Sequence, residues 1–307
     1  MVTSRVQPLA DSLRRAWSGG LRIERAAVVV AAVLFTSGLV HLGVLVVSGG
    51  TWLGPLSMRK AVTFGLSFGL TLASVVWATT FLRMGPRARR VLITAFTIAC
   101  VVEVALVTTQ AWRHVPSHFN FETGFDTAVS TTLAIGGGVI VATAIGWTIA
   151  AFRTVAQAPP SVRLAVRFGF VALLIALGVG AAMIATGSVA ARGGSPEVAY
   201  TTAGALKPAH AVAMHAILVV PGMAWLLTFT PWTERTRTRI VASAVVAYLA
   251  LIVVVVLESV THVSPLDPPL AAAVVSALAL GGVLVTGGLA LLGVARVTGG
   301  ASAPGSA

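Results

Sequence analysis

Eight long apolar stretches constrain the fold of this 307-residue chain more than any other feature of its sequence. A transmembrane helix needs about 20 consecutive apolar residues to cross the hydrocarbon core of a bilayer. Inside that core a helix satisfies its backbone hydrogen bonds within the segment itself. The stretches therefore predict about eight membrane-spanning helices, at residues 26–48, 61–82, 91–112, 127–152, 165–190, 209–230, 239–260 and 270–295.

The composition supports the same class of protein. Hydrophobic residues make up 57% of the chain and charged residues only 10%, whereas a soluble domain carries roughly 25% charged residues. The chain has too little polar surface to stay dissolved in water, so the lipid bilayer is its expected partner. The single cysteine, Cys100, lies inside the third stretch, which excludes an intramolecular disulfide and a cysteine-based zinc site. We predict an all-α polytopic transmembrane helix bundle.

The distribution of lysine and arginine predicts how the helices cross the membrane. The net charge of +12 arises from short basic clusters between the apolar stretches, not from one basic patch, which argues against nucleic acid as a partner. Loops on the cytoplasmic side carry an excess of lysine and arginine. With the N-terminus on that side, the outer segments keep only a few basic residues: Arg59, Lys60, Arg113, Arg192 and Lys207. The prediction is a bacterial inner-membrane protein with both termini in the cytoplasm.

The chain divides into three predicted parts. Residues 1–25 form a basic leader, in which apolar residues recur at helical spacing: Val6, Leu9, Leu13 and Trp17. This pattern is typical of an interfacial helix on the cytoplasmic leaflet, and a disordered leader is the alternative. Residues 26–296 form the transmembrane domain. Residues 297–307 contain mainly Gly, Ser, Ala and Pro and are predicted to be disordered.

Titratable side chains concentrate in the outer half of the predicted bundle. All six histidines lie in outer loops or in the outer half of a span, and two carboxylates, Glu103 and Glu258, lie inside spans. An ionisable group at mid-membrane costs at least roughly 2.5 kcal/mol, so it is usually functional or paired. Arg59 and Lys60 enter the second span from the outside and could neutralise either carboxylate.

These residues predict an outward-facing polar pocket. Glu103 forms its floor, the loop from His114 to Asp126 its lid, and its walls are His41, His215 and Glu258. The leading hypothesis is a metal- or haem-binding redox protein, because imidazoles from different helices of a bundle ligate haem and transition metals. The predicted metal ligands are His41, His210 and His215.

Two other functions stay open. A proton-coupled or small-molecule transporter would use Glu103, Glu258 and the nearby histidines as a proton relay. A membrane enzyme acting on a lipid or isoprenoid substrate would use acid–base groups near the headgroup boundary. Taken together, the candidate catalytic residues are Glu103, His118, Asp126 and Glu258, and the candidate substrate-binding residues are Arg59, Lys60, Arg113, Ser117 and Asn120.

The segment Gln110–Asp126 (QAWRHVPSHFNFETGFD) resembles a family of uncharacterised bacterial multi-pass membrane proteins. Members carry an Arg, then Ser-His-Phe-Asn, then Thr and Asp leading into the next span. The pair Arg59–Lys60 and the segment Lys207–His210, followed by His215, are also similar to that family. The resemblance implies a common outer-face site but no reaction, and the residues it places there are Arg113, Ser117, His118, Asn120, Thr123, Asp126, His210 and His215.

Overall fold

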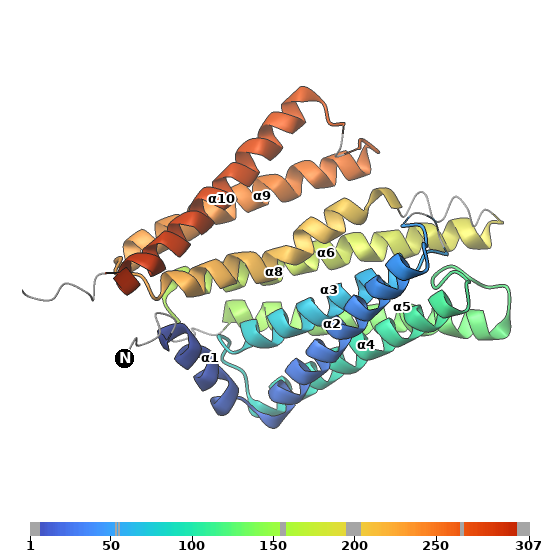
Figure 1. The fold of residues 1–307 in the computed structure, drawn as a ribbon, viewed down its shortest axis with the longest axis horizontal. Helices are drawn as coiled ribbons and strands as arrows, with labels where there is room; N and C mark the ends of the chain where they lie inside the picture. Colours follow the sequence, from blue (N-terminus) through green and yellow to red (C-terminus); the bar gives the residue numbers. More distant parts are fainter. Residues whose placement is uncertain are drawn as a thin grey trace, which may run out of the picture.

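The computed structural model describes residues 7–52, 54, 56–153, 158–194, 204–264 and 267–299 (Figure 1). Over these ranges the protein is all-α, with nine helices and no strand. The helices are α1 (Gln7–Gly19), α2 (Arg22–Val47), α3 (Arg59–Thr79), α4 (Pro86–Trp112), α5 (Gly124–Arg153), α6 (Pro160–Arg192), α8 (Lys207–Leu227), α9 (Glu234–Val260) and α10 (Leu270–Gly299).

Eight of these helices, α2 to α10, are long and apolar enough to cross a membrane, which confirms the predicted polytopic bundle. Several begin a few residues before the predicted apolar stretch. Pro86 opens α4 and Pro160 opens α6, because proline suits a first turn, whose N–H groups have no partner within the helix. At the start of α9 the Thr233 hydroxyl accepts a hydrogen bond from the N–H of Thr236. A prediction of helix starts from hydropathy alone leaves out such polar or proline-containing first turns.

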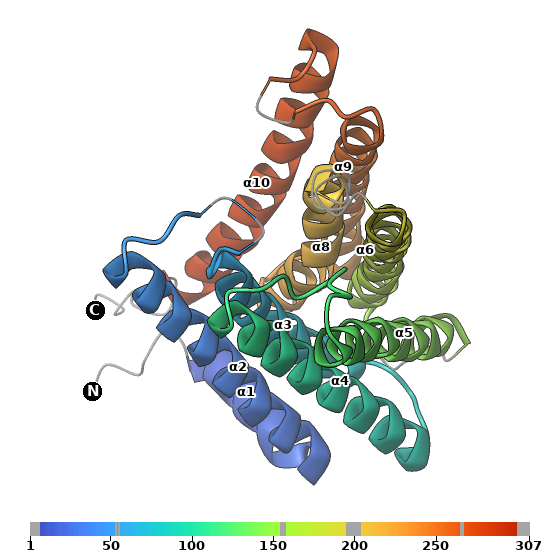
Figure 2. The same cartoon turned by 90° about the vertical axis from the view of Figure 1, so that its right-hand side faces the viewer.

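The helices run alternately between two ends of the bundle. The end that holds α1 and the start of α2 is named the leader end, and the opposite end is named the far end (Figure 1). Figure 2 looks along the bundle from the far end. It shows α2, α3 and α4 on one side, α9 and α10 on the other, and α6 and α8 between them. Helix α2 packs on α3 and α4, and α3 and α5 contact α8 and α6 respectively.

Helices α2 and α3 approach each other so closely that their backbones are in contact. A Cβ atom added to Gly38 would lie 2.6 Å from the backbone nitrogen of Leu66, and one added to Gly65 would lie 2.6 Å from Gly38. A Cβ on Gly69 would lie 2.6 Å from the nitrogen of Phe35. Small residues at helix crossings permit this close approach in membranes, where packing rather than water drives association.

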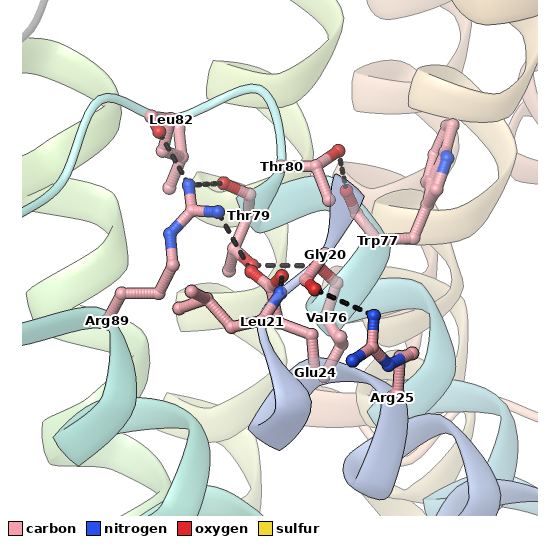
Figure 3. A network of polar contacts seen from close by, with 10 residues as sticks. All are labelled: Gly20, Leu21, Glu24, Arg25, Val76, Trp77, Thr79, Thr80, Leu82 and Arg89. Atoms are coloured by element: carbon pink, nitrogen blue, oxygen red, sulfur yellow. Dashed lines mark hydrogen bonds and ion pairs between the residues drawn. The ribbon is translucent and has the colours of Figure 1, made fainter. Parts of the chain in front are cut away.

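A buried ion pair joins α2 to α4 at the leader end (Figure 3). The Arg89 guanidinium donates to the Glu24 carboxylate over 2.8 Å, and it also donates to the carbonyl oxygens of Thr79 and Leu82, each at 2.8 Å. The second Glu24 oxygen accepts from the N–H of Leu21 at 2.7 Å and so caps α2. These contacts tie together the start of α2, the end of α3 and the first turns of α4.

Helix α1 lies at the leader end beside the bundle. Its Ser12 hydroxyl accepts a hydrogen bond from the indole of Trp225 on α8, at 3.3 Å. Leu13 and Trp17 are exposed. The predicted leader is thus helical over Gln7–Gly19, while its position on a membrane leaflet stays a prediction. Residues 1–6, and residues 300–307 of the predicted tail, lie outside the described residues.

Candidate functional site

A polar network closes the far end of α4 and α5 around Asp126, which is 2% exposed. One carboxylate oxygen accepts from Gln110 at 2.8 Å and from Arg113 at 2.6 Å. The other oxygen accepts from the Thr123 hydroxyl at 2.6 Å, and that hydroxyl accepts from the N–H of Asp126. Arg113 also donates to the amide oxygen of Gln110. The predicted catalytic Asp126 and substrate-binding Arg113 therefore form an ion pair with each other, which stabilises the helix connection.

The loop from His114 to Thr123 lies against α6. Phe119 has a positive φ of 61°, and its ring occupies the position that a side chain at Gly187 of α6 would fill. The Arg192 guanidinium at the end of α6 lies 5.0 Å from the centroid of the Phe121 ring. A non-glycine residue with positive φ needs compensating contacts. The packing of the Phe119 ring against Gly187 of α6 supplies them. The predicted lid is thus packed on the bundle.

Three cations gather where α3 and α8 begin. Arg59 and Lys60 open α3, and Lys207 opens α8. The charges of Arg59 and Lys207 both act on the Lys60 ammonium, and the charge of Arg59 acts on Lys207. Within the described ranges no ion pair joins Arg59 or Lys207 to a carboxylate. We name Arg59, Lys60 and Lys207 the cation cluster.

Ser117 and His118 border the cation cluster. The Lys60 ammonium donates to the Ser117 hydroxyl at 3.3 Å, and that hydroxyl lies 3.0 Å from Nδ1 of His118. The imidazole also lies against the Phe64 ring, with centroids 5.7 Å apart. Burial lowers the pKa of His118 to about 3, and the charge of Lys60 acts in the same direction. His118 is therefore a neutral imidazole at pH 7 and a weak base, suited to exchange a hydrogen bond with the Ser117 hydroxyl.

Asn120 lies at the same end, is 3% exposed, and holds the loop against α5. Its carbonyl accepts from Ser130 at 3.0 Å, and its amide oxygen accepts from the N–H of Glu122 at 3.1 Å. Its amide nitrogen has no hydrogen-bond partner among the described residues. Asn120 is therefore mainly a structural residue of the loop, and the two N–H donors of its amide have no partner among the described residues.

The two carboxylates predicted inside the membrane lie in separate parts of the bundle. Glu103 is on α4, which packs on α2, α3 and α5, whereas Glu258 is on α9, which packs on α6, α8 and α10. Both side chains are buried. The structure does not bring them together as the floor and wall of one pocket.

The histidines predicted as metal ligands also lie apart. His41 on α2 is 8% exposed, and both of its ring nitrogens have partners: Nδ1 lies 2.7 Å from the carbonyl of Ser37, and Nε2 accepts from the Trp112 indole at 3.0 Å. His215 on α8 is exposed, and its Nδ1 lies 2.7 Å from the carbonyl of Ala211.

His210 turns toward α6. Its Nδ1 lies 2.7 Å from the carbonyl of Ala176, and its ring lies where a Cβ on Gly180 would be 3.2 Å away. Across the described residues, no group of three or more His, Cys, Asp or Glu side chains could hold a metal ion. For Nε2 of His41 to ligate a metal, Trp112 would have to move away.

Sequence reasoning missed two features of this end. Lys207 was not predicted as a site residue, although it opens its helix as Lys60 does. The contact of Trp112 with His41 was also missed, because nothing in the spacing of the two residues indicates that their helix faces meet.

No family model, no curated protein and no solved structure matches this chain. The fold and the eight apolar helices define the class: this is a multi-pass membrane protein. The resemblance of the 110–126 segment to an uncharacterised family stays a prediction.

Proposed function

We propose that the far end of this membrane protein binds a substrate through its anionic group, a phosphate or a carboxylate. The observation that carries the proposal is the cation cluster. Like charges held together near low-dielectric surroundings repel one another. An anion bound between the three cations would be attracted to each of them and would offset their mutual repulsion.

The helix geometry favours the same ligand. Arg59 and Lys207 stand at the N-terminal ends of α3 and α8. The helix dipole places partial positive charge at such ends, which favours an anion there, although the N–H groups of Arg59 and Lys60 themselves donate to Ser57. Ser117 adds a hydroxyl beside Lys60. Arginine, lysine and hydroxyl donors are the groups that bind phosphate and carboxylate oxygens in proteins.

We further propose that the far end faces the outside of a bacterial inner membrane and that the leader end faces the cytoplasm. Besides the cation cluster, only Arg113 and Arg192 among the described lysines and arginines lie at the far end. All other described basic residues lie toward the leader end, as the positive-inside rule expects for the cytoplasmic side. In this orientation the cation cluster meets a solute arriving from outside or a headgroup of the outer leaflet. Capture of a small anion for transport is the activity we propose.

An enzyme acting on an anionic lipid is a second candidate, favoured by the Ser117–His118 pair. The imidazole lies 3.0 Å from the hydroxyl, and an anionic headgroup bound beside Lys60 would offset the charge that lowers the pKa of His118, which would make it a stronger base. The metal- or haem-binding hypothesis has less support, because His41 holds Trp112 and Ser37 while His215 is exposed on another helix.

The test is isothermal titration calorimetry of the detergent-purified protein with two probes, inorganic phosphate and a short-chain phosphatidic acid. Binding of phosphate alone identifies a small-anion site, and tighter binding of the phosphatidic acid identifies a lipid headgroup site. A hydrogen bond to a charged group contributes about 1.5–3 kcal/mol, so Lys207→Gln should weaken binding by about tenfold or more.

Arg192→Gln is the matched control, because it removes a cation from the same end outside the cluster. It should leave the affinity unchanged. Without ligand, Lys207→Gln should unfold at the same or a higher temperature than the parent, since it relieves repulsion from Arg59. Failure of both probes to bind, or equal losses in the two variants, would contradict the proposal.

A further inference from the structure

We propose that Glu103 is a proton-binding site: its carboxyl carries a proton in the folded protein and releases it when water or a cation reaches the carboxyl. This site is distinct from the cation cluster and does not depend on the anion-binding proposal. It rests on the position of the carboxyl, the space around it and the charges of the helices that pack on α4.

Glu103 lies deep in the bundle. It is nine residues before Trp112, the last residue of α4, and therefore about 13 Å from that end at 1.5 Å per residue. The longer part of α4 separates it from the leader end. The side chain is 4% exposed, and neither a hydrogen bond nor an ion pair of its carboxyl occurs among the described residues.

Gly136 on α5 provides the space for this carboxyl. A Cβ atom added to Gly136 would lie 2.8 Å from a carboxyl oxygen of Glu103. The next two residues of α5, Gly137 and Gly138, have nothing within 4 Å of an added Cβ. Of these three glycines, only the one facing Glu103 is required by the packing, and the carboxyl takes the volume of the missing side chain.

No cation faces the carboxyl from the helices packed on α4. Their titratable side chains lie near the helix ends, apart from His41. The His41 ring accepts a hydrogen bond from Trp112, the last residue of α4, and not from Glu103. These side chains are Arg22, Glu24, Arg25 and His41 on α2, Arg59 and Lys60 on α3, and Asp126 and Arg153 on α5. On α4 itself, Arg87, Arg89 and Arg90 lie in the first two turns, and the buried Cys100 is one turn from Glu103.

An ionised carboxylate without a counter-charge is strongly disfavoured in such surroundings, and the group neutralises by taking up a proton. The uncharged acid can remain where it is. Ionisation requires water or a cation to reach the carboxyl. A change in the packing around Glu103 that admits either one would release the proton, a coupling that a transporter can use.

The first test uses dicyclohexylcarbodiimide, an apolar reagent that modifies protonated carboxyl groups inside membranes. The acid proton moves to a carbodiimide nitrogen, the carboxyl oxygen bonds to the central carbon, and rearrangement leaves a stable N-acylurea. Peptide mass spectrometry should find this adduct on Glu103 at neutral pH. Glu258→Gln should retain it, which separates the two buried carboxyls.

The second test is infrared spectroscopy of the detergent-purified protein at neutral pH. The carbonyl stretching band of a protonated carboxylic acid should be present and should weaken in Glu103→Gln. Because glutamine matches the uncharged acid in shape, this variant should unfold at the temperature of the parent.

Gly136→Val should block the adduct by filling the space of the carboxyl, whereas Gly138→Val should not. A folded protein with no adduct on Glu103 and no change of the acid band in Glu103→Gln would overturn the proposal. Its failure is separable from that of the anion site, because Lys207→Gln should keep the adduct and Glu103→Gln should keep phosphate affinity.

Discussion

Replacement of Arg89 by methionine should strongly destabilise the protein. The change removes the only ion-pair partner of Glu24 in Figure 3 and leaves the carbonyls of Thr79 and Leu82 without their donor. The Arg89 and Glu24 side chains are only 16% and 7% exposed, so water cannot replace the lost contacts easily. Removing one partner of a buried ion pair costs about 3–5 kcal/mol.

Cys100 provides the assay, because it is the only cysteine and is 0% exposed. A maleimide can reach its thiol only in molecules that have opened, so the labelling rate in detergent follows the population of the open state. At 1.4 kcal/mol per factor of ten, Arg89→Met should raise that rate by roughly two to three and a half orders of magnitude.

The controls separate the ion pair from a general effect of charge. Arg90→Met removes a neighbouring arginine that is exposed, and it should change the rate by less than about threefold, as surface substitutions do. Glu24→Gln added to Arg89→Met should recover part of the loss, because it removes the unpaired buried charge. The reasoning fails if Arg89→Met raises the labelling rate less than about tenfold, or if the second change makes it worse.

Two further predictions concern residues at the far end, His118 and Gly187. The pKa of His118 is about 3 in the folded protein against an ordinary 6.5, so the unfolded chain binds more protons between these values and stability falls as the pH drops through that window. Thermal unfolding between pH 7 and pH 4 should show a shallower fall in His118→Gln, and equal slopes would refute this. Gly187→Ala should displace the Phe119 ring and destabilise the protein by about 1–3 kcal/mol, measured by Cys100 labelling. Gly178→Ala, in the same helix but in open space, should be neutral or stabilising, and similar effects of the two changes would argue against the loop contact.

The sequence predicts the helices of this protein well, because lipid demands long apolar segments with internal hydrogen bonds. The predicted third span ends at residue 112, and α4 ends at Trp112. Starts are less accurate: α9 begins at Glu234 and the predicted span at residue 239, since charged residues form the first turn. Position along a helix follows from counting: His41 lies six residues before the end of α2 and Glu103 nine residues before the end of α4, while their depth in a membrane stays a prediction.

The direction in which a side chain points could not be predicted. In a soluble helix one face is polar, whereas in lipid every face is apolar and periodicity gives little information about rotation. His215 was therefore expected in the same pocket as His41, yet it is exposed on α8. The ion pair of Arg89 with Glu24 was hidden for a related reason, because each residue also fits the ordinary role of a charged group flanking a span.

The contact of α2 with α3 has a consequence for how this protein could be traced through evolution. At Gly38, Gly65 and Gly69 the neighbouring backbone leaves no volume for a methyl group, so a descendant that keeps this helix pair should keep all three glycines, while the lipid-facing apolar residues around them are less constrained. Distant relatives would then share a spaced glycine pattern and little else. A search could be built on those three positions together with the Arg59–Lys60 pair in the first turn of α3, which precedes Gly65 and Gly69. It would find kin that overall similarity overlooks.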